Sequence, residues 1–219
     1  MAPPRPRLLT FDLFGTVVDW REGLRAAVRA HGIDLTEEQF EAVIDAQGED
    51  EPAGFRPYVE IVERSLVRVL GMDARDARAV GERAGEWPLF PDASGAIRRL
   101  LALAPCGATT NSDLRHRAAI EAQLGCRMTY WICAEAVGAY KPDPRIWQAA
   151  ARAADVDYGQ GWWHVSAYAD YDLTTARGLG LTTVLVERPH HRPGTPAEVD
   201  LRVPDLATLA EVAVGDQFR

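Results

Sequence analysis

The sequence predicts an α/β fold, and three observations support that prediction. An apolar segment with a single acid, residues 8–14, has the pattern of a short buried strand. Residues 20–87 contain only patterns that are typical of helices. From residue 88 onward, strand and helix patterns alternate, which indicates a parallel sheet covered on both faces. We therefore assign residues 1–19 and 88–219 to a Rossmann-like core and residues 20–87 to an inserted helical cap.

The cap helices follow helical periodicity, and two of them carry end signals. Gly32 is a natural C-terminal stop for the first helix. Thr36 and Gln39 have the spacing of a capping box at the start of the second. The third helix has apolar side chains at helical spacing on one face, and the fourth pattern is weaker. These helices are expected at residues 21–32, 35–47, 55–71 and 73–87.

The core elements are predicted from the same kinds of signal. Strands are expected at residues 106–112, 128–134, 162–167 and 182–187. Helices are expected at residues 93–103, 113–125, 142–154, 171–180 and 207–214. Asp113 caps one of these helices, and proline stands in the first turn of the helix at 142–154. Residues 201–206 are expected to connect the last strand to the final helix, and the polar loop 188–200 is expected at the surface.

Composition excludes several classes of partner. The net charge of −8 argues against nucleic acid and anionic membranes, because both require a basic surface. A small anionic substrate remains compatible with a local cationic pocket. The three cysteines have neither metal-type nor redox-type spacing, which favours reduced thiols in the cytoplasm. No signal peptide and no membrane span are predicted.

Polar side chains gather where the predicted strands end, which is where parallel sheets bind ligands. Asp12 supplies a carboxylate that can act as a covalent nucleophile. Lys141 supplies a compact ammonium, and it is the only lysine among 24 basic side chains. Asp172 supplies a second carboxylate, useful as a base or as a partner of Lys141. Neutral hydrogen-bonding groups come from Thr16, Thr110, Asn111, Ser112 and Ser166.

The motifs at these strand ends resemble, in order, those of the haloacid dehalogenase superfamily. Residues 11–19 (FDLFGTVVD) resemble its first motif, and residues 110–112 (TNS) its second. Residues 140–144 (YKPDP) resemble its third, and residues 164–172 (HVSAYADYD) lie where the fourth belongs. The resemblance implies a hydrolase with an aspartate nucleophile and a helical cap.

Two positions distinguish the two main chemistries of that superfamily. Its phosphatases place a second aspartate two residues after the nucleophile and bind Mg²⁺ with fourth-motif acids. Phe14 and Ala167 stand at those positions here. The chain is therefore most similar to the 2-haloacid dehalogenase branch, which displaces a leaving group at carbon through an ester intermediate. That resemblance implies a small carboxylic acid as substrate and no metal or cofactor. Mg²⁺ belongs only to the alternative of a small-molecule phosphatase.

The resemblance also assigns roles to residues. It implies that Asp12 is the nucleophile, oriented with the substrate carboxylate by Thr16 and Lys141. Asp172 is expected to pair with Lys141 and to position water. Lys141 is expected to keep Asp12 ionised by lowering its pKa. The substrate-binding side chains expected from the resemblance are Phe14, Thr110, Asn111, Ser166 and Tyr168.

The leaving group and the substrate remain open. The branch has a halide-binding arginine about thirty residues after the nucleophile, but residues 39–55 contain acids and no arginine. Arg56 is the nearest candidate, in the wrong register. Tyr168 and Trp147 also replace an asparagine and a tyrosine of the branch. Two further alternatives are a hydrolase that opens a ring at a C–N bond and a binding protein without catalysis. The resemblance also suggests a homodimer.

Several other side chains favour structural interpretations. Trp20, Phe55, Tyr58 and Trp147 are interpreted mainly as core aromatics, and Tyr168 is weighed in the same way. His164 lies within an apolar strand and is interpreted as structural. Asp19 is expected to cap or hinge the first cap helix.

Overall fold

The computed structural model describes residues 3–50, 54–189 and 198–215, and it confirms the predicted α/β fold. One parallel sheet has the strand order β3-β2-β1-β4-β5-β6. The strands are β1 (Leu8–Phe11), β2 (Cys106–Thr110), β3 (Tyr130–Cys133), β4 (Trp162–Ser166), β5 (Thr182–Val186) and β6 (Leu201–Val203). The chain builds outward from β1 on one side and then continues from β4 on the other. The strand order therefore reverses at β1, where open α/β sheets bind ligands.

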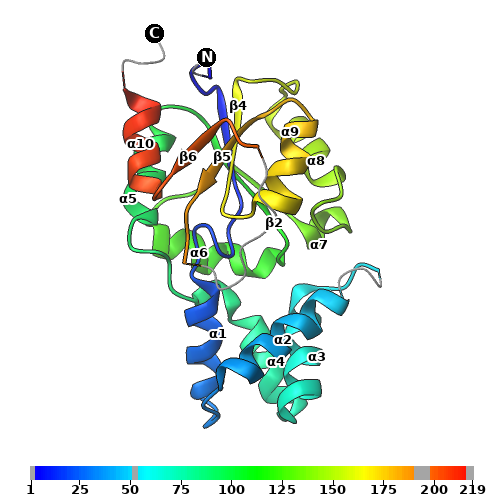
Figure 1. The fold of residues 1–219 in the computed structure, drawn as a ribbon. Helices are drawn as coiled ribbons and strands as arrows, with labels where there is room; N and C mark the ends of the chain where they lie inside the picture. The colour runs from blue at the N-terminus through cyan, green and yellow to red at the C-terminus, as the bar shows by residue number, and fades with distance from the viewer. Residues whose placement is uncertain (1–2, 51–53, 190–197, 216–219) are drawn as a thin grey trace.

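Helices cover both faces of the sheet (Figure 1). One face packs against α5 (Ala93–Leu101), α6 (Arg117–Leu124) and α10 (Leu206–Val214). The other face packs against α8 (Arg145–Ala154) and α9 (Thr174–Gly178). Because both faces are covered, the central strands are buried along their whole length, as continuous apolar strands require.

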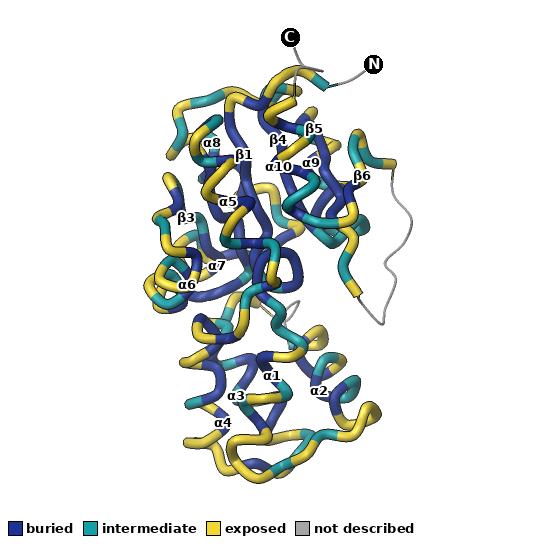
Figure 2. Tube along the Cα trace, turned by 90° about the vertical axis from the view of Figure 1, so that its left-hand side faces the viewer, coloured by how far each residue is buried: buried dark blue, intermediate teal, exposed yellow. Residues whose placement is uncertain are grey.

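The helical cap is inserted between β1 and β2 and lies at one end of the sheet (Figure 1). Its helices are α1 (Trp20–Arg29), α2 (Glu37–Asp50), α3 (Tyr58–Leu70) and α4 (Ala74–Glu82). Both capping-box hydrogen bonds between Thr36 and Gln39 form, and Asp19 caps α1 as expected. The inner faces of the helices are buried and continue the apolar cluster of the core (Figure 2).

Two residues of the core supply hydrogen-bond partners to the ends of helices in the cap. The Asp113 carboxylate accepts hydrogen bonds from the backbone N–H groups of Tyr58 (2.7 Å) and Val59 (3.0 Å), at the start of α3. The His116 ring accepts at Nδ1 from Asp113 N–H, so Nε2 donates to the Gly81 carbonyl of α4 at 3.0 Å. Burial lowers the pKa of His116, which keeps this ring neutral. We call these contacts the core–cap clasp.

The structure differs from the prediction in several elements, and one of them, the short helix α7 (Ala134–Val137), follows β3 where no helix was predicted. Residues 201–203 form β6 rather than a plain connection, because Asp200 anchors this segment to the N–H and hydroxyl groups of Thr183. Three residues are too few to show strand alternation in a sequence. The helix expected at residues 171–180 is a π-helix at Ala169–Leu173 followed by α9. Most of the predicted surface loop, residues 190–197, lies outside the described residues. No described helix is long and apolar enough to cross a membrane.

We predict that Asp113→Ala will lower the free energy of unfolding by about 2–3 kcal/mol, because it leaves the first N–H groups of α3 without a buried, charged acceptor. The matched control is Asp73→Ala, which removes the exposed N-cap of α4 inside the cap and should cost about 1 kcal/mol. Urea unfolding of both variants provides the measurement. Equal losses would show that the clasp adds nothing beyond an ordinary helix cap.

Candidate active site

The carboxyl ends of the central strands bring the predicted polar residues together. Asp12 directly follows β1, and its N–H donates to Val165 of β4 at 2.9 Å. Asp172 lies in the π-helix after β4, and Lys141 lies in the loop before α8. Parallel strands end at the same edge of a sheet, so segments more than a hundred residues apart meet here.

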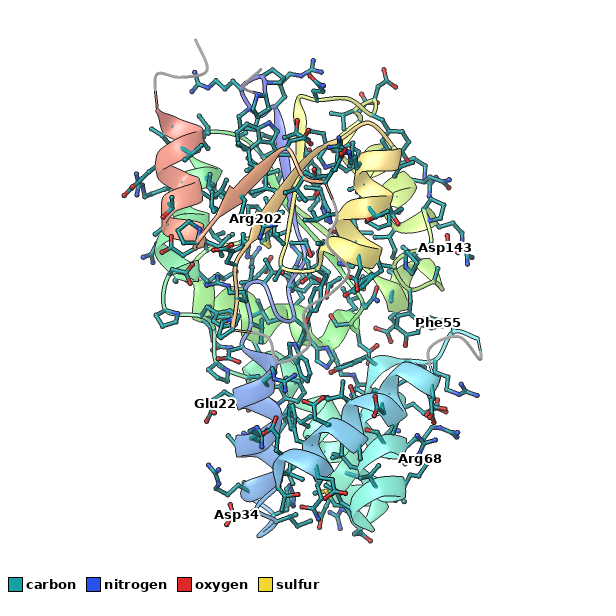
Figure 3. The ribbon with its side chains drawn as sticks, in the orientation of Figure 1. Glu22, Asp34, Phe55, Arg68, Asp143 and Arg202 are labelled. Atoms are coloured by element: carbon teal, nitrogen blue, oxygen red, sulfur yellow. The ribbon has the colours of Figure 1, made fainter. Side chains whose placement is uncertain are left out.

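Lys141 binds both carboxylates. Its Nζ lies 2.8 Å from Asp12 Oδ1 and 2.7 Å from Asp172 Oδ2, and all three side chains are almost fully buried. The charged side chains labelled in Figure 3 contrast with this site, because they lie at the outside of the molecule; they are Glu22, Asp34, Arg68, Asp143 and Arg202. The predicted pair of Lys141 and Asp172 is therefore present, with Asp12 as a second partner.

Thr16 holds the other oxygen of Asp12. Its hydroxyl donates to Asp12 Oδ2 at 2.6 Å and accepts from the Ala167 N–H at 2.9 Å. The intervening turn needs Gly15, which has a φ of +97°. A Cβ atom there would also lie 2.2 Å from the Tyr168 hydroxyl. The Gly-Thr turn after β1 thus brings the Thr16 hydroxyl within reach of Asp12.

Arg188 supports the same turn from the end of β5. Its guanidinium donates to the Thr16 carbonyl from Nε at 3.1 Å and from Nη2 at 2.8 Å. It also forms a bidentate pair with Asp92 at 3.0 Å and lies over the Phe90 ring. Nothing in the motifs marked Arg188, because its function depends on the fold of distant segments.

The loop after β2 is fixed to the loop that carries Lys141. The Lys141 N–H donates to Asn111 Oδ1 at 2.7 Å, and Asn111 Nδ2 donates to the Lys141 carbonyl at 3.3 Å. The Lys141–Pro142 peptide bond is cis. Thr110 is fully buried and donates to Ser112 at 3.2 Å. Asn111 therefore orients the backbone of Lys141 while its own side chain reaches the cavity.

Burial and neighbouring charges shift the pKa values of the three ionisable groups in different directions. Burial raises the pKa of Asp12 above its ordinary value of 3.8, and the nearby Asp172 charge adds to the rise; Lys141 and Thr16 offset it only in part. Burial disfavours the charge of Asp172 as well, but Lys141 and His164 hold its pKa well below the usual range. The two carboxylates overcome the effect of burial on Lys141 and raise its pKa. Lys141 does lower the pKa of Asp12, as expected, but burial outweighs it, so the expected net lowering of the Asp12 pKa is wrong.

A cavity of about 240 Å³ opens above Asp12, between the core and the cap. Half of the residues that line it are aromatic. The core contributes Asp12, Phe14, Asn111, Tyr168 and Tyr171, and the cap contributes Trp20, Ile44, Gln47, Gly48 and Tyr58. Trp20 Nε1 donates to the Tyr168 hydroxyl at 2.9 Å, which ties the cap wall to the core wall. Such a cavity suits a small organic substrate with few charges.

The cavity separates the predicted substrate-binding residues into two groups. Phe14, Asn111 and Tyr168 line it. Thr110 and Ser166 are fully buried and do not line it. The hydroxyl of each bonds within its own loop: Thr110 donates to Ser112, and Ser166 accepts from the Tyr168 N–H at 3.1 Å. A direct contact of Thr110 or Ser166 with substrate is not supported by this placement.

Some aromatic residues interpreted as core belong to the cavity. Trp20 and Tyr58 line it, together with Tyr168, whereas Trp147 is a core residue. Phe55 is 37% exposed and packs on Tyr140 at the junction of cap and core (Figure 3). Gln47 also lines the cavity and was not predicted to do so. The only signal in the sequence is its position three residues after Ile44 on α2, and that signal can be interpreted only once the orientation of the cap is known.

The cap side of the cavity carries no cation among the described residues. Arg56 lies outside the lining, near the Asp50 carbonyl (3.4 Å) and Glu60 (3.5 Å). The acids of residues 39–55 are also absent from the described lining. Asp50, for example, pairs with Arg64 at 3.0 Å on the outside of the cap.

The donor set does not fit a divalent cation. Asp12 and Asp172 would have to supply the oxygen ligands, but all four of their oxygens already accept hydrogen bonds. A cation bound there would have to displace the Lys141 ammonium, and Ala167 offers no side-chain ligand. The described residues contain no cluster of three or more histidine, cysteine, aspartate or glutamate side chains that could hold a metal ion. Independence from metal itself stays a prediction.

Comparisons with known proteins agree with this architecture. A family model described as haloacid dehalogenase-like hydrolase matches residues 6–163. A defluorinating L-2-haloacid dehalogenase is similar in structure, with a TM-score of 0.85 and 20% identity over 98% of this chain and 99% of that one.

Two further solved structures show the same similarity. Another L-2-haloacid dehalogenase has a TM-score of 0.82 and 26% identity over 94% of this chain and 99% of that one. The Xanthobacter autotrophicus L-2-haloacid dehalogenase with covalently bound chloropropionic acid has a TM-score of 0.83 and 18% identity, covering 96% and 99%. No curated protein sequence matches the chain.

We predict opposite effects of two Asp→Asn substitutions on stability. Asp172→Asn should lower the free energy of unfolding by about 3–5 kcal/mol at pH 7, because Lys141 and His164 lose their shared charged acceptor. Asp12→Asn should leave the protein as stable or more stable, because it removes a charge that burial disfavours. Urea unfolding at several pH values is the measurement.

The sign with pH follows from the raised pKa of Asp12. The protonated Asp12 carboxyl makes its full contribution to stability below pH 3.8, and that contribution is lost as the pH rises through the raised pKa. The free energy of unfolding of Asp12→Asn should therefore increasingly exceed that of the native chain as the pH rises above 3.8. Below pH 3.8 this difference should vanish. Equal losses in both variants would contradict the division of charge between the carboxylates.

Proposed function

Because the chain belongs to the haloacid dehalogenase-like hydrolases, we propose that it displaces a leaving group at a saturated carbon of a small carboxylic acid. The Asp12 carboxylate is the nucleophile in this proposal, and an aspartyl ester is the intermediate. One observation carries it: Asp12 lies at the floor of an aromatic cavity with Lys141 on one oxygen and Thr16 on the other. A 2-haloacid dehalogenase or dehalogenase-like enzyme is the activity that we expect.

The chemistry follows from the contacts of Asp12. An oxygen of the carboxylate attacks the carbon, and the leaving group takes the bonding electron pair and departs on the opposite side. Water then attacks the ester carbonyl, and the oxygen that is not esterified still has Lys141 or Thr16 as donor to stabilise its negative charge. Cleavage passes one proton of the water to the departing alkoxide oxygen and the other to solvent, which releases the hydroxy acid and restores the Asp12 carboxylate.

Backbone donors beside Asp12 suit the substrate carboxylate. Among the described residues, the N–H groups of Leu13 and Phe14 donate to no protein acceptor. They follow the nucleophile directly, and Phe14 lines the cavity. Two free N–H groups side by side can hold an anion without a cationic side chain, so the substrate carboxylate belongs there.

Carbon is favoured over phosphorus by the same contacts. A transferring phosphoryl group needs cations or a metal to neutralise its charge. The described lining offers no cationic side chain, and all oxygens of Asp12 and Asp172 are engaged. Phe14 also occupies the place where a phosphatase would have its general acid. A degenerate phosphatase and a non-catalytic binding protein are the alternatives that the tests below distinguish.

Hydrolysis of a C–N bond is a second candidate, and the cap side of the cavity favours it. A departing halide develops negative charge beside Ile44, Gln47 and Gly48, which supply no cation. A protonated ring nitrogen departs as a neutral amine, so attack by Asp12 removes charge rather than moving it. Aromatic faces also attract cations. A small cyclic amino acid with a strained ring is the matching substrate.

We predict that turnover in H₂¹⁸O will place ¹⁸O in the carboxylate of Asp12, because water attacks the enzyme ester rather than the substrate carbon. Substoichiometric 2-chloropropionate supplies the substrate, and halide release should be unchanged by EDTA. Mass spectrometry of the tryptic peptide 8–21, with fragmentation to separate Asp12 from Asp19, gives the position of the label.

Asp12→Asn should abolish turnover, and the matched control Asp34→Asn, far out on the cap, should leave it unchanged. Label found only in the product, or Asp12→Asn that remains active, would contradict a covalent mechanism. Mg²⁺-dependent hydrolysis of p-nitrophenyl phosphate would move the assignment to the phosphatase. No activity and no labelling with halo acids or cyclic amino acids would favour a binding protein.

We predict that Gln47→Arg will change the two candidate reactions in opposite directions. A cation on the cap side should stabilise a departing halide and raise kcat for 2-chloropropionate by about 10-fold, the effect of roughly 1.4 kcal/mol. The same cation should repel a protonated ring nitrogen and lower turnover of cyclic amino acids. Gln47→Met is the neutral control of similar size. Equal changes for both substrate classes would show that the leaving group does not face Gln47.

A further inference from the structure

A buried row of hydrogen bonds continues behind Asp172, away from the cavity. His164 Nε2 lies 2.8 Å from Asp172 Oδ1, and His164 Nδ1 lies 2.9 Å from Thr10 Oγ1. Trp162 Nε1 donates to the same Thr10 oxygen at 2.8 Å. Thr10, Trp162 and His164 lie on the adjacent strands β1 and β4 and are at most 2% exposed. The row therefore runs inside the sheet from an indole to the carboxylate that binds Lys141.

The chemistry of the end groups fixes each proton in this row. The Trp162 indole can only donate, and the ionised Asp172 carboxylate can only accept. His164 must therefore carry a proton on Nε2, and in the neutral ring Nδ1 presents a lone pair. The Thr10 hydroxyl accepts from Trp162 and donates to that lone pair. Every polar atom in the row has a partner under this assignment, whereas a neutral ring with its proton on Nδ1 would set the Nε2 lone pair against Asp172 Oδ1.

We propose that His164 is a positioning residue for the reaction of Asp12, acting through Asp172; this rests on the proposed function. His164 occupies Oδ1 of Asp172, so only Oδ2 faces Lys141. The carboxylate cannot rotate to take two protons of the ammonium, and Lys141 keeps one proton directed at Asp12 Oδ1. His164 touches neither the cavity nor Asp12, and its effect on turnover passes through the shared ammonium.

A purely structural role makes a different prediction. The His164 ring also packs edge-on against Trp147, with centroids 5.6 Å apart and an interplanar angle of 80°. If His164 only filled space, a ring of similar size would preserve function, and a flexible amide would not. If it positions Asp172, a donor at the place of Nε2 is what matters.

The experiment compares three substitutions of His164. The side chain of His164→Gln reaches Asp172 with an N–H group, that of His164→Asn is too short to do so, and His164→Phe keeps the ring without a donor. We expect His164→Phe and His164→Asn to lower kcat by roughly 10–100-fold with KM nearly unchanged, since a hydrogen bond to a buried charge is lost. His164→Gln should recover most of kcat. Trp147→Phe is the packing control and should retain kcat.

A second readout uses the single lysine of the chain. Protein grown with lysine labelled with ¹⁵N at Nζ gives one ammonium signal, which reports Lys141 directly. This signal should move in His164→Phe and His164→Asn and remain in place in His164→Gln and Trp147→Phe. Ring ¹⁵N spectra of the native protein should show the His164 proton on Nε2.

The outcomes separate this proposal from the proposed function. Equal kcat in His164→Phe and His164→Gln, or an unmoved Lys141 signal in His164→Phe, overturns the positioning role while leaving the reaction intact. A His164 proton on Nδ1 in the native protein overturns it as well. If no tested substrate reacts, the proposed function fails, and the Lys141 signal alone decides whether His164 fixes the ammonium.

Discussion

The structure of the site depends on one ammonium shared by two buried carboxylates. Lys141 cannot satisfy Asp12 and Asp172 equally, because Asp172 has a second donor in His164 and Asp12 has only the Thr16 hydroxyl. The result is an asymmetric pair, in which Asp172 is held firmly as an anion and Asp12 retains charge that burial disfavours. An ester at Asp12 would remove that charge, and this gives the group a physical reason to react.

The fold and the composition of the site could be predicted from the sequence because both follow from strand ends. Asp12, Asn111 and Asp172 each follow an apolar segment, and parallel strands must end at one edge. Lys141 stood out because it is the only lysine among so many arginines. The pairing of Lys141 with Asp172 then required only that the motifs be adjacent, which the strand order provides.

The rest depended on geometry that no local pattern contains. The aromatic walls come from Trp20 and Tyr58 of the cap, and whether such residues face a core or a cavity depends on how the cap packs on the sheet. His164 looked like any residue of a buried strand, since its partner lies in a π-helix that the sequence did not predict. The direction of the Asp12 pKa likewise required knowing how deeply the carboxylate is buried and that Asp172 lies nearby.

The core–cap clasp has a consequence for how such enzymes diversify. The first turn of α3 has its buried acceptor on Asp113, a residue of the core rather than of the cap. The end of α4 similarly depends on His116. A cap transplanted by recombination onto another core would therefore lose two helix ends unless the recipient offered matching side chains. Substrate range in this scaffold should consequently change more readily by point substitution at the cavity wall than by exchange of whole caps.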